Sequence, residues 1–151
     1  MNTPEIVQLD EITDLRRRVL RADDPNASVV VAEDAIPGCF HLGLKNGHEV
    51  IGAVSAFPCP SPDLEHPNPW QFRFMAIDEA FQGQGLGRVL IEELLRMLQD
   101  EGVTLLWANG RDTALGFYDA IGFTRVPGSA HASPSTGLPH HRIVMELPHD
   151  R

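Results

Sequence analysis

The stretch FRFMAIDEAFQGQGLGRVLIEELLRMLQDEG, residues 72–102, decides the fold. Residues 72–77 read as a strand, and residues 86–99 show helical spacing, with leucines on one face at every fourth position. The glycine-rich segment 82–87 joins the two. Residues 103–108 follow and are nearly all apolar, as expected of a strand that is covered on both faces. A strand, a helix and a second strand in this order predict a parallel pair with a right-handed crossover.

Shorter strand patterns lie on both sides of this region and predict antiparallel pairing. Asn46-Gly47 separates two of them, and this dipeptide favours the positive φ angles of a tight hairpin turn. Together with the parallel pair, these patterns predict an α/β fold with a mixed, mostly antiparallel sheet and flanking helices. The length predicts a single domain that covers residues 1–151. The strands predicted outside the central region are residues 6–9, 39–44, 49–57, 123–126 and 142–147.

A helix is expected near the amino terminus. Asp10 can cap it, and its apolar positions Ile12, Leu15 and Val19 follow helical spacing. The arginine run at residues 16–18 also lies on this helix. Because consecutive helical residues point in different directions, we expect the run to form a solvated face without a functional role.

The carboxyl-terminal part combines a short helix with long loops. Asp112 can cap a helix that runs through Ala120, and Gly122 can end it. Residues 58–69 carry five prolines and can form neither a helix nor a central strand. Residues 127–139 are rich in Gly, Ser and Pro. Both segments are therefore predicted to be surface loops.

The composition argues against several classes of function. The formal net charge of -9 disfavours nucleic-acid binding, which relies on clustered Lys and Arg to neutralise phosphates. No apolar run suits a signal peptide or a membrane span, so we expect a soluble, cytoplasmic protein. Cys39 and Cys59 show no metal or redox spacing. We therefore expect two thiols without a disulfide, and no metal site.

The segment Gln82-Gly83-Gln84-Gly85-Leu86-Gly87 lies where a phosphate-binding loop would lie. Unpaired N–H groups and the positive end of the helix dipole converge at a helix amino terminus, and glycines let phosphate oxygens approach closely. A Walker-type loop would end in Gly-Lys-Ser/Thr, whereas Gly87 is followed by Arg88 and Val89. A dinucleotide loop would need glycine in place of Arg88 and would turn directly from strand into helix. A plain helix-starting turn rarely needs three alternating glycines.

This segment resembles the Gln/Arg-x-x-Gly-x-Gly/Ala signature of the GNAT acetyltransferases. A second motif agrees, because Phe117-Tyr118-Asp119-Ala120-Ile121-Gly122-Phe123 is similar to the family's aromatic-Tyr pair on a short helix that ends in Gly-Phe. The order of elements resembles the same fold from residue 6 to residue 147, least specifically in the amino-terminal third. The resemblance implies the GNAT acyl-CoA N-acyltransferase fold. It also implies transfer of an acetyl or similar acyl group from acetyl-CoA or another acyl-CoA to a primary amine.

The resemblance further implies which residues bind the donor. The backbone of Met75, Ala76 and Ile77 would carry the pantetheine arm, and an N–H near Ile77 would polarise the thioester carbonyl. Asn109 would bond to the pantetheine amides, but in its Asn-Gly pair it fits a turn equally well. The residues expected around the pyrophosphate are Gln82, Gly83, Gln84, Gly85, Leu86, Gly87 and Arg88.

Tyr118, the only tyrosine of the chain, is the candidate general acid. A phenol has an unperturbed pKa of about 10, keeps its proton at neutral pH and can give it to the leaving thiolate. The competing interpretation is a core aromatic whose hydroxyl bonds to a carbonyl. The resemblance implies direct transfer within a ternary complex, with no covalent enzyme intermediate.

The resemblance does not identify a general base. Many family members place a Glu on the strand that is formed here by residues 72–77, which carry no carboxylate. Asp78 and Glu79 lie next to this strand. His140 and His141 are adjacent on a predicted strand, so only one of them can face a cleft. A water relay is the remaining route.

Two other functions stay open from the sequence. The missing strand carboxylate permits a sensor or regulatory module that binds acyl-CoA without turnover, and the glycine loop alone permits a nucleotide binder. The expected partner is a small-molecule or peptide amine, with neither nucleic acid nor membrane involved, and a homodimer is left open. Loops 58–69 and 127–139 are expected to shape the acceptor pocket, because loops commonly carry specificity. Their composition does not reveal the acceptor or the acyl chain.

Overall fold

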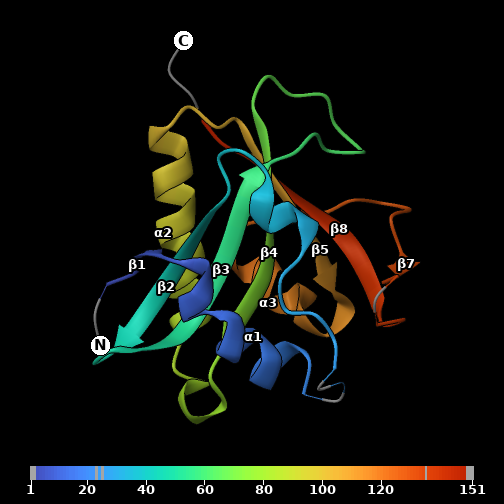
Figure 1. Cartoon of the computed structure of the whole chain (residues 1–151). Helices are drawn as coiled ribbons and strands as arrows, with labels where there is room; N and C mark the ends of the chain where they lie inside the picture. Colours follow the sequence, from blue (N-terminus) through green and yellow to red (C-terminus); the bar gives the residue numbers. More distant parts are fainter. Residues whose placement is uncertain (1–2, 23, 25, 135, 149–151) are drawn as a thin grey trace. The chain divides into compact units, whose positions relative to one another are not determined.

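The computed structural model of the chain describes residues 3–22, 24, 26–134 and 136–148 (Figure 1). It forms two compact units. Unit 1 comprises Met1–Pro58 and Phe72–Met97, and unit 2 comprises Cys59–Gln71 and Leu98–Arg151. The strand Pro69–Ile77 and the helix Leu86–Asp100 each begin in one unit and end in the other. The single domain expected from the sequence stays a prediction.

The strands follow one hydrogen-bonded path, β1-β2-β3-β4-β5-β8-β6, with β7 paired to β8. The strands are β1 (Glu5–Val7), β2 (Phe40–Asn46), β3 (Glu49–Pro58), β4 (Pro69–Ile77), β5 (Leu105–Arg111), β6 (Thr124–Arg125), β7 (His131–Ala132) and β8 (Pro139–Glu146). The helices are α1 (Thr13–Leu20), α2 (Leu86–Asp100) and α3 (Leu115–Ile121), with the single 3-10 turns η1 (Leu9–Glu11), η2 (Ala32–Ala35), η3 (Glu79–Phe81) and η4 (Asp112–Ala114). β4 and β5 are parallel, whereas β1–β2, β2–β3, β5–β8, β6–β8 and β7–β8 are antiparallel. The predicted mixed α/β fold with one parallel pair is confirmed.

The helices α1 and α2 cover opposite faces of the strands of unit 1. Ile12 and Leu15 pack in one cluster with Ala53 of β3. A Cβ built on the preceding residue, Gly52, would lie 3.2 Å from Leu90 Cδ1 in α2. Because successive side chains of a strand point to opposite faces, Gly52 allows α2 to approach the sheet closely on the side away from α1.

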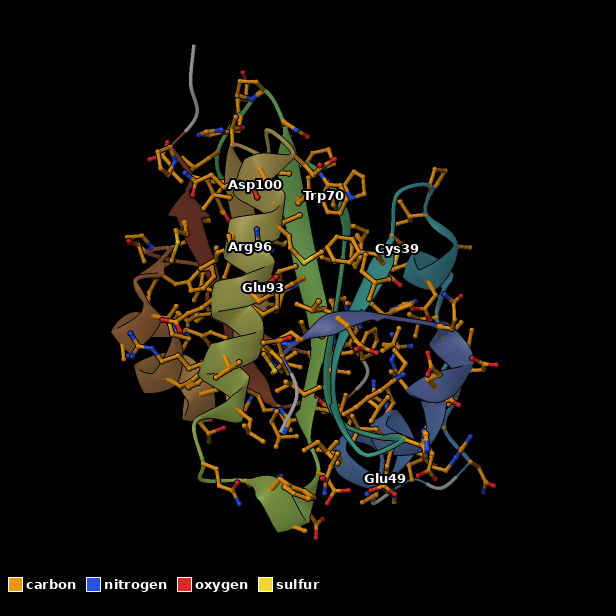
Figure 2. All side chains as sticks on the ribbon, turned by 90° about the vertical axis from the view of Figure 1, so that its left-hand side faces the viewer. Cys39, Glu49, Trp70, Glu93, Arg96 and Asp100 are labelled. Atoms are coloured by element: carbon orange, nitrogen blue, oxygen red, sulfur yellow. The ribbon has the colours of Figure 1, made fainter. Side chains whose placement is uncertain are left out.

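The predicted amphipathic pattern of α2 is confirmed. Leu90, Leu94 and Leu98 are buried, as their fourfold spacing predicted. Glu93 and Arg96 lie next to each other on α2, with Arg96 Nε 3.0 Å from Glu93 Oε1 (Figure 2). Such an exposed pair one turn apart contributes only a few tenths of a kcal/mol, about 0.2–0.5, so burial of the leucines is the main force that holds α2 in place.

In unit 2, β5 is covered on both faces, as the apolar run predicted. On one face, a Cβ at Gly110 would lie within 3.4–3.5 Å of the side chains of Leu115 and Tyr118. On the other face, Trp107 packs in a second cluster, and its Nε1 donates a hydrogen bond to the carbonyl of Cys59 at 3.0 Å. The absence of a side chain at Gly110 therefore gives α3 room against the sheet.

The two predicted loops are only partly irregular. Within segment 58–69, residues 59–68 form the loop between β3 and β4, and the guanidinium of Arg142 holds this loop through Asp63 at 2.6 Å and 3.0 Å. Within residues 127–139 the short strand β7 pairs with β8. β4 and β8 each begin three residues earlier than predicted, at Pro69 and Pro139. A proline is tolerated at the first residue of a strand, where its missing N–H breaks no ladder.

Two of the predicted helix caps are wrong. Asp10 lies inside η1, and α1 begins only after Ile12. Asp112 lies inside η4, and its Oδ1 accepts a hydrogen bond from His141 Nδ1 at 2.7 Å instead. In both places a 3-10 turn precedes the α-helix, so the carboxylate comes too early to cap the helix. The predicted stop at Gly122 is confirmed by its φ of 122°.

Cys39 and Cys59 are not joined by a disulfide, as predicted. In the part of the chain that the structure describes, no helix has the length and the apolar character needed to cross a membrane.

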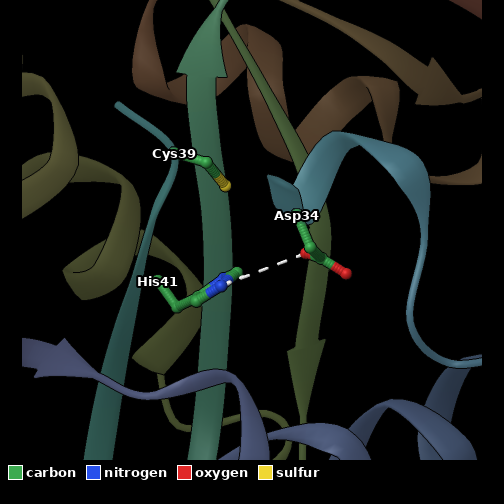
Figure 3. Close-up of side chains that lie close together, drawn as sticks. All are labelled: Asp34, Cys39 and His41. Atoms are coloured by element: carbon green, nitrogen blue, oxygen red, sulfur yellow. Dashed lines mark ion pairs between the residues drawn. The ribbon is translucent and has the colours of Figure 1, made fainter. Parts of the chain in front are cut away.

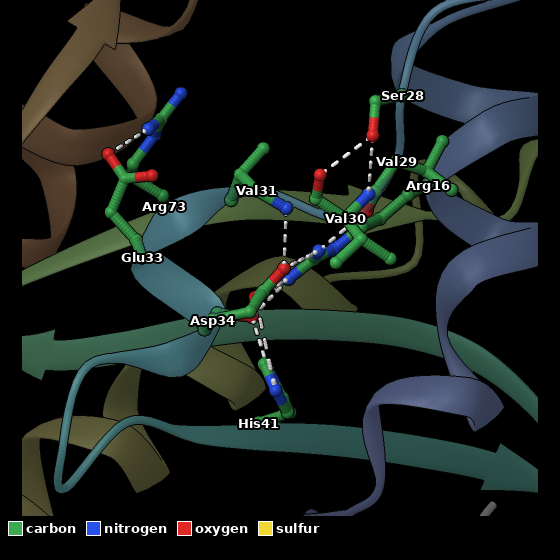
Figure 4. A network of polar contacts seen from close by, with 10 residues as sticks. Arg16, Ser28, Val29, Val30, Val31, Glu33, Asp34, His41 and Arg73 are labelled. Carbon is green, nitrogen blue, oxygen red and sulfur yellow. Dashed lines mark hydrogen bonds and ion pairs between the residues drawn. The ribbon is translucent and has the colours of Figure 1, made fainter.

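The prediction of a solvated arginine run is wrong for Arg16. This side chain is only 2% exposed and makes four hydrogen bonds (Figure 4). Nη1 donates to the carbonyl of Val29 at 2.8 Å and to Asp34 Oδ2 at 2.9 Å. Nη2 donates to Asp34 Oδ1 and to Ser55 Oγ, both at 2.9 Å. Arg16 thus connects α1 with the segment before η2, with η2 and with β3.

A buried carboxylate completes this arrangement. Asp34 is 4% exposed in its side chain and also accepts a hydrogen bond from the N–H of Val31 at 2.9 Å. Burial alone would raise the pKa of Asp34, but the hydrogen bonds from Arg16 and Val31 hold it below its ordinary value. A lowered pKa in the folded state stabilises the fold at neutral pH, and this contribution is lost as the pH falls through that pKa.

We expect Arg16→Met to lower the free energy of unfolding by about 3–5 kcal/mol, because it leaves the Asp34 carboxylate buried without its counter-charge. Arg17→Met changes the exposed neighbour on the same helix and should cost less than about 1 kcal/mol. Urea unfolding followed by circular dichroism measures both. Adding Asp34→Asn to Arg16→Met should recover part of the loss, and equal losses for the two single variants would contradict the assigned role of the ion pair.

Candidate functional site

The strand β4 departs from regular geometry at Phe74. Its φ is 59°. Among the residues that the structure describes, Phe74 is the one non-glycine residue with a positive φ. The guanidinium carbons of Arg16 and Arg73 lie 4.4 Å and 4.5 Å from the centre of its ring. This conformation is costly for a bulky side chain and persists only where the surroundings impose it. The strained residue directly precedes residues 75–77, the backbone predicted to bind the donor.

The side chains of the predicted donor strand take part in packing. Ala76 is 2% exposed and belongs to the same core cluster as Ile12. Met75 and Ile77 are half-buried, and Ile77 Cδ1 lies 2.9 Å from the Cβ position of Gly52. The packing role considered for the side chain of Ile77 is therefore confirmed, and that of Met75 stays a prediction.

The glycine loop has the conformation that its sequence predicted at two of its three glycines. Gly83 and Gly85 both have φ of 80°. A Cβ built on either would meet no heavy atom within 4 Å, so the need for glycine here is conformational and not steric. Gly87 lies inside α2 and follows the helical path.

The loop ends at a helix start with unpaired amides. The first helical hydrogen bond runs from the N–H of Val89 to the carbonyl of Gly85 at 3.2 Å. The N–H groups of Leu86, Gly87 and Arg88 therefore have no acceptor within the helix. The first turn of α2 carries no acidic residue that would oppose an anion. Residues 82–85 and Arg88 are exposed, and Leu86 and Gly87 are half-buried, so this helix start lies at the surface of unit 1, where anions commonly bind.

The polar side chains of the loop have different roles. Gln82 Nε2 donates to the carbonyl of Ile77 at 2.9 Å and ties the loop to the end of β4. Gln84 is exposed. Arg88 Nε lies 3.1 Å from Glu92 Oε2, and both side chains are about half exposed, at 52% and 55%. An exposed pair of this kind is weak, so the guanidinium can exchange its partner for a phosphate at little cost.

In unit 2, Tyr118 is a buried aromatic. It is 7% exposed and contacts Phe117 and Phe123 edge to face, with ring centres 5.0 Å and 5.8 Å apart. Burial raises the pKa of Tyr118 to about 12. The hydroxyl therefore keeps its proton at neutral pH, as the acid hypothesis requires. The same shift makes it a weaker acid than an ordinary phenol.

Asn109 is exposed and lies within β5, opposite Arg142 of β8. The alternative that Asn109 is a turn residue is therefore wrong. Its binding of the donor stays a prediction.

The candidate bases differ in how they are held. Asp78 accepts hydrogen bonds from the N–H of Ala80 and from Arg18 Nη1, both at 2.9 Å, and these lower its pKa. A carboxylate held in this way is a poor base. Glu79 is exposed in η3.

The two adjacent histidines also have different partners. His141 Nδ1 lies 2.7 Å from Asp112 Oδ1, whereas His140 Nδ1 lies 2.8 Å from the carbonyl of Leu138. A carboxylate on Nδ1 orients the imidazole of His141 and leaves Nε2 as the nitrogen that can accept a proton.

The predicted site residues fall into two groups. Residues 75–77 and 82–88 belong to unit 1, where the bond from Gln82 to Ile77 brings the strand end and the glycine loop together. Asn109 and Tyr118 belong to unit 2. Sequence reasoning missed the buried network around Arg16, although Arg16 follows Ile12 by four positions and so falls on the apolar stripe of α1. It could not find the strained Phe74, because nothing local in the sequence marks that conformation.

Comparison with known proteins gives a family and a fold. A profile described as the acetyltransferase (GNAT) family matches residues 9–123, a range that includes both the glycine loop and the Tyr118 motif. The resemblance inferred from those motifs is thereby confirmed. The chain is 28% identical over 139 residues to the uncharacterized N-acetyltransferase YitI of Bacillus subtilis (strain 168), covering 92% of this chain and 91% of that protein.

A second relative matches over a shorter region. Over 77 residues the chain is 35% identical to the ribosomal protein bS18-alanine N-acetyltransferase of Escherichia coli (strain K12), which covers 49% of this chain and 52% of that protein. Neither the profile nor these relatives favour a module that binds acyl-CoA without turnover.

Among solved structures, the fold matches that of an aminoglycoside 6'-N-acetyltransferase complexed with coenzyme A. The TM-score is 0.77 at 12% identity, and the match covers 99% of this chain and 100% of that chain. At this identity the likeness concerns the fold alone, and it confirms the predicted acyl-CoA N-acyltransferase fold.

Proposed function

Because the chain belongs to the acetyltransferase (GNAT) family, whose donor is an acyl-CoA, we propose that it transfers an acetyl group from acetyl-CoA directly to a primary amine. The observation that carries this proposal is the glycine loop of residues 82–87. Two left-handed glycines lead into a helix start with unpaired amides and no acidic side chain. The reaction takes place in the cytoplasm, as the sequence predicts, and its chemistry draws on no metal ion.

The loop would bind the pyrophosphate of the donor. The amides of Leu86, Gly87 and Arg88 lie at the amino terminus of α2, where the helix dipole favours negative charge. Arg88 would leave Glu92 and pair with a phosphate oxygen. Gln82 would keep the loop against the end of β4 through its bond to Ile77.

The backbone of Met75, Ala76 and Ile77 would bind the pantetheine arm and polarise the thioester carbonyl. The positive φ of Phe74 lies within β4, directly before this segment. A local departure from regular strand geometry changes the direction of the neighbouring backbone groups, which supports the proposal that they bind a ligand. Asn109 of β5 would bond to the pantetheine amides.

Tyr118 would stabilise the leaving sulfur. Complete proton transfer from a phenol of pKa about 12 to a thiolate whose conjugate acid has a pKa of about 8.5 is unfavourable by about 5 kcal/mol. A hydrogen bond from the hydroxyl to the sulfur has no such cost, and it strengthens as negative charge develops. We therefore assign Tyr118 the role of a hydrogen-bond donor to the thiolate, with net protonation completed by solvent.

The amine must lose a proton as it attacks. Among the candidate bases His141 is favoured, because Asp112 orients its ring, whereas Asp78 is held by two donors. The acceptor is proposed to be a small-molecule or peptide amine. The name of one relative supports this class, since that protein acts on the alanine of a ribosomal protein.

We expect the purified protein to release thiol from acetyl-CoA when a suitable amine is present. The assay tests polyamines, aminoglycosides, amino acids and amino-terminal peptides against an amine-free blank. A ligand at about 100 times its dissociation constant adds about 2.7 kcal/mol to stability, so coenzyme A should also protect the fold against heat. Protection without turnover on any amine would contradict the transferase proposal, and a lack of protection would remove the donor site.

We expect Gly85→Ala to weaken coenzyme A binding by at least about tenfold, because φ of 80° is costly for alanine and relaxation would turn the loop amides away from the phosphates. Gly102→Ala is the matched control, since Gly102 has φ of 79° and equally open surroundings at the other end of α2. Titration calorimetry measures the affinity of both variants. An equal loss of affinity in the two would show that general strain, and not the loop, is responsible.

We expect Tyr118→Phe to lower kcat by about 10-fold to 100-fold and to leave the affinity for coenzyme A nearly unchanged. With the pKa of Tyr118 at about 12, its ionisation should cause no fall in kcat below about pH 10. Phe123→Leu removes an aromatic neighbour without removing a hydroxyl and serves as the control. A kcat that is the same in Tyr118→Phe and in the unmodified protein would remove Tyr118 from the mechanism.

A further inference from the structure

Asp34, Cys39 and His41 form a cluster that the proposed transfer does not use (Figure 3). One ligand atom from each, a carboxylate oxygen, the sulfur and a ring nitrogen, all lie within 4.8 Å of one another. Asp34 belongs to η2, Cys39 directly precedes β2, and His41 is the second residue of β2. A tight turn, closed by a hydrogen bond from the N–H of Cys39 to the carbonyl of Ile36 at 2.9 Å, brings them together.

We propose that Asp34, Cys39 and His41 bind a divalent transition-metal ion of the Zn²⁺ type. Thiolate, imidazole and carboxylate are the ligands that Zn²⁺ takes in proteins. Bonds of about 2.0–2.3 Å in a tetrahedral site place ligand atoms roughly 3.3–3.8 Å apart. Side-chain rotations of less than about 1.5 Å would bring the three atoms from their present spacing to that distance.

The ligands are already oriented by neighbouring groups. His41 Nδ1 lies 2.7 Å from Ser55 Oγ, which leaves Nε2 facing Asp34 Oδ1 at 4.0 Å. Asp34 itself is held by Arg16 and by the N–H of Val31 (Figure 4). Metal-binding histidines and carboxylates are usually fixed by such outer hydrogen bonds, which raise metal affinity. The cluster therefore has two of its three ligands in place before an ion binds.

Charge sets the strength of this site. The guanidinium of Arg16 contacts the same carboxylate and repels a second cation, so we expect weaker binding than at a closed structural zinc site with four ligands. The Cys39 thiol is protonated without metal, because burial raises its pKa to about 11, and it releases this proton to water as the metal–sulfur bond forms. Among the described residues the cluster has three ligands, so water takes the fourth position.

The sequence does not predict this site, because the spacing Asp-x4-Cys-x-His is not one of the common zinc patterns. The inference does not rest on the proposed transferase function. A bound metal ion would be a second ligand of unit 1, and it would connect η2 with the start of β2.

The test is titration of the full, reduced chain with Co²⁺, a spectroscopic substitute for Zn²⁺. We expect a thiolate-to-cobalt charge-transfer band in the near ultraviolet that saturates at about one equivalent and is abolished by excess Zn²⁺, which binds such ligands more tightly. Cys39→Ser should abolish the band. Cys59→Ser, which changes the other half-buried cysteine of the chain, should leave it unchanged.

His41→Gln provides a second, independent variant, since its amide can still bond to Ser55. We expect it to weaken Co²⁺ binding by at least about tenfold. Circular dichroism verifies that each variant is folded. A missing band in the unmodified chain overturns the proposal, and so does a band that persists in folded Cys39→Ser. If Cys39→Ser does not fold, an unchanged affinity in His41→Gln overturns it, and a weakened one supports it.

Discussion

The buried guanidinium of Arg16 is the interaction on which the architecture of unit 1 depends. It joins α1 to the carbonyl of Val29, to Asp34 of η2 and to Ser55 of β3, and it lies against the ring of Phe74 in β4. Its Nε is the buried side-chain polar atom without a hydrogen-bond partner among the described residues. A planar group with several fixed donors can connect this many segments, whereas a lysine ammonium cannot. A charge at this depth requires the Asp34 carboxylate beside it.

The same network reaches the strand that is proposed to bind the donor. The guanidinium groups of Arg16 and Arg73 both lie against the ring of Phe74, whose backbone is left-handed within β4. Unfavourable conformations of this kind need support from tertiary contacts. The cation–π contacts and the buried ion pair supply that support within unit 1. The same residues therefore stabilise the fold and support the proposed site. A substitution that weakens this network would also change the backbone conformation of residues 75–77.

Burial has opposite consequences for the groups considered for chemistry. It raises the pKa of Tyr118 to about 12, which guarantees a protonated hydroxyl but weakens it as an acid. It lowers the pKa of His41, an effect to which the charge of Arg16 adds, so the imidazole is neutral and able to act as a ligand. Exposed groups such as Arg88 keep weak partners that a phosphate can replace. The proposed role of each of these side chains therefore depends on its burial and its hydrogen bonds more than on its residue type.

The sequence by itself determined the features that depend on neighbouring residues along the chain. The spacing of the leucines predicts α2, and the apolar run 103–108 predicts a strand that is covered on both faces. Gly83 and Gly85 predict the loop conformation. Each of these features follows from local backbone geometry. Tertiary structure alone decided that Arg16 is buried, that Phe74 is left-handed and that Asp34, Cys39 and His41 converge. It also decided that the Asp112 carboxylate bonds to His141 and does not cap a helix. These features depend on atoms supplied by segments far apart in the chain, and local spacing does not encode such contacts.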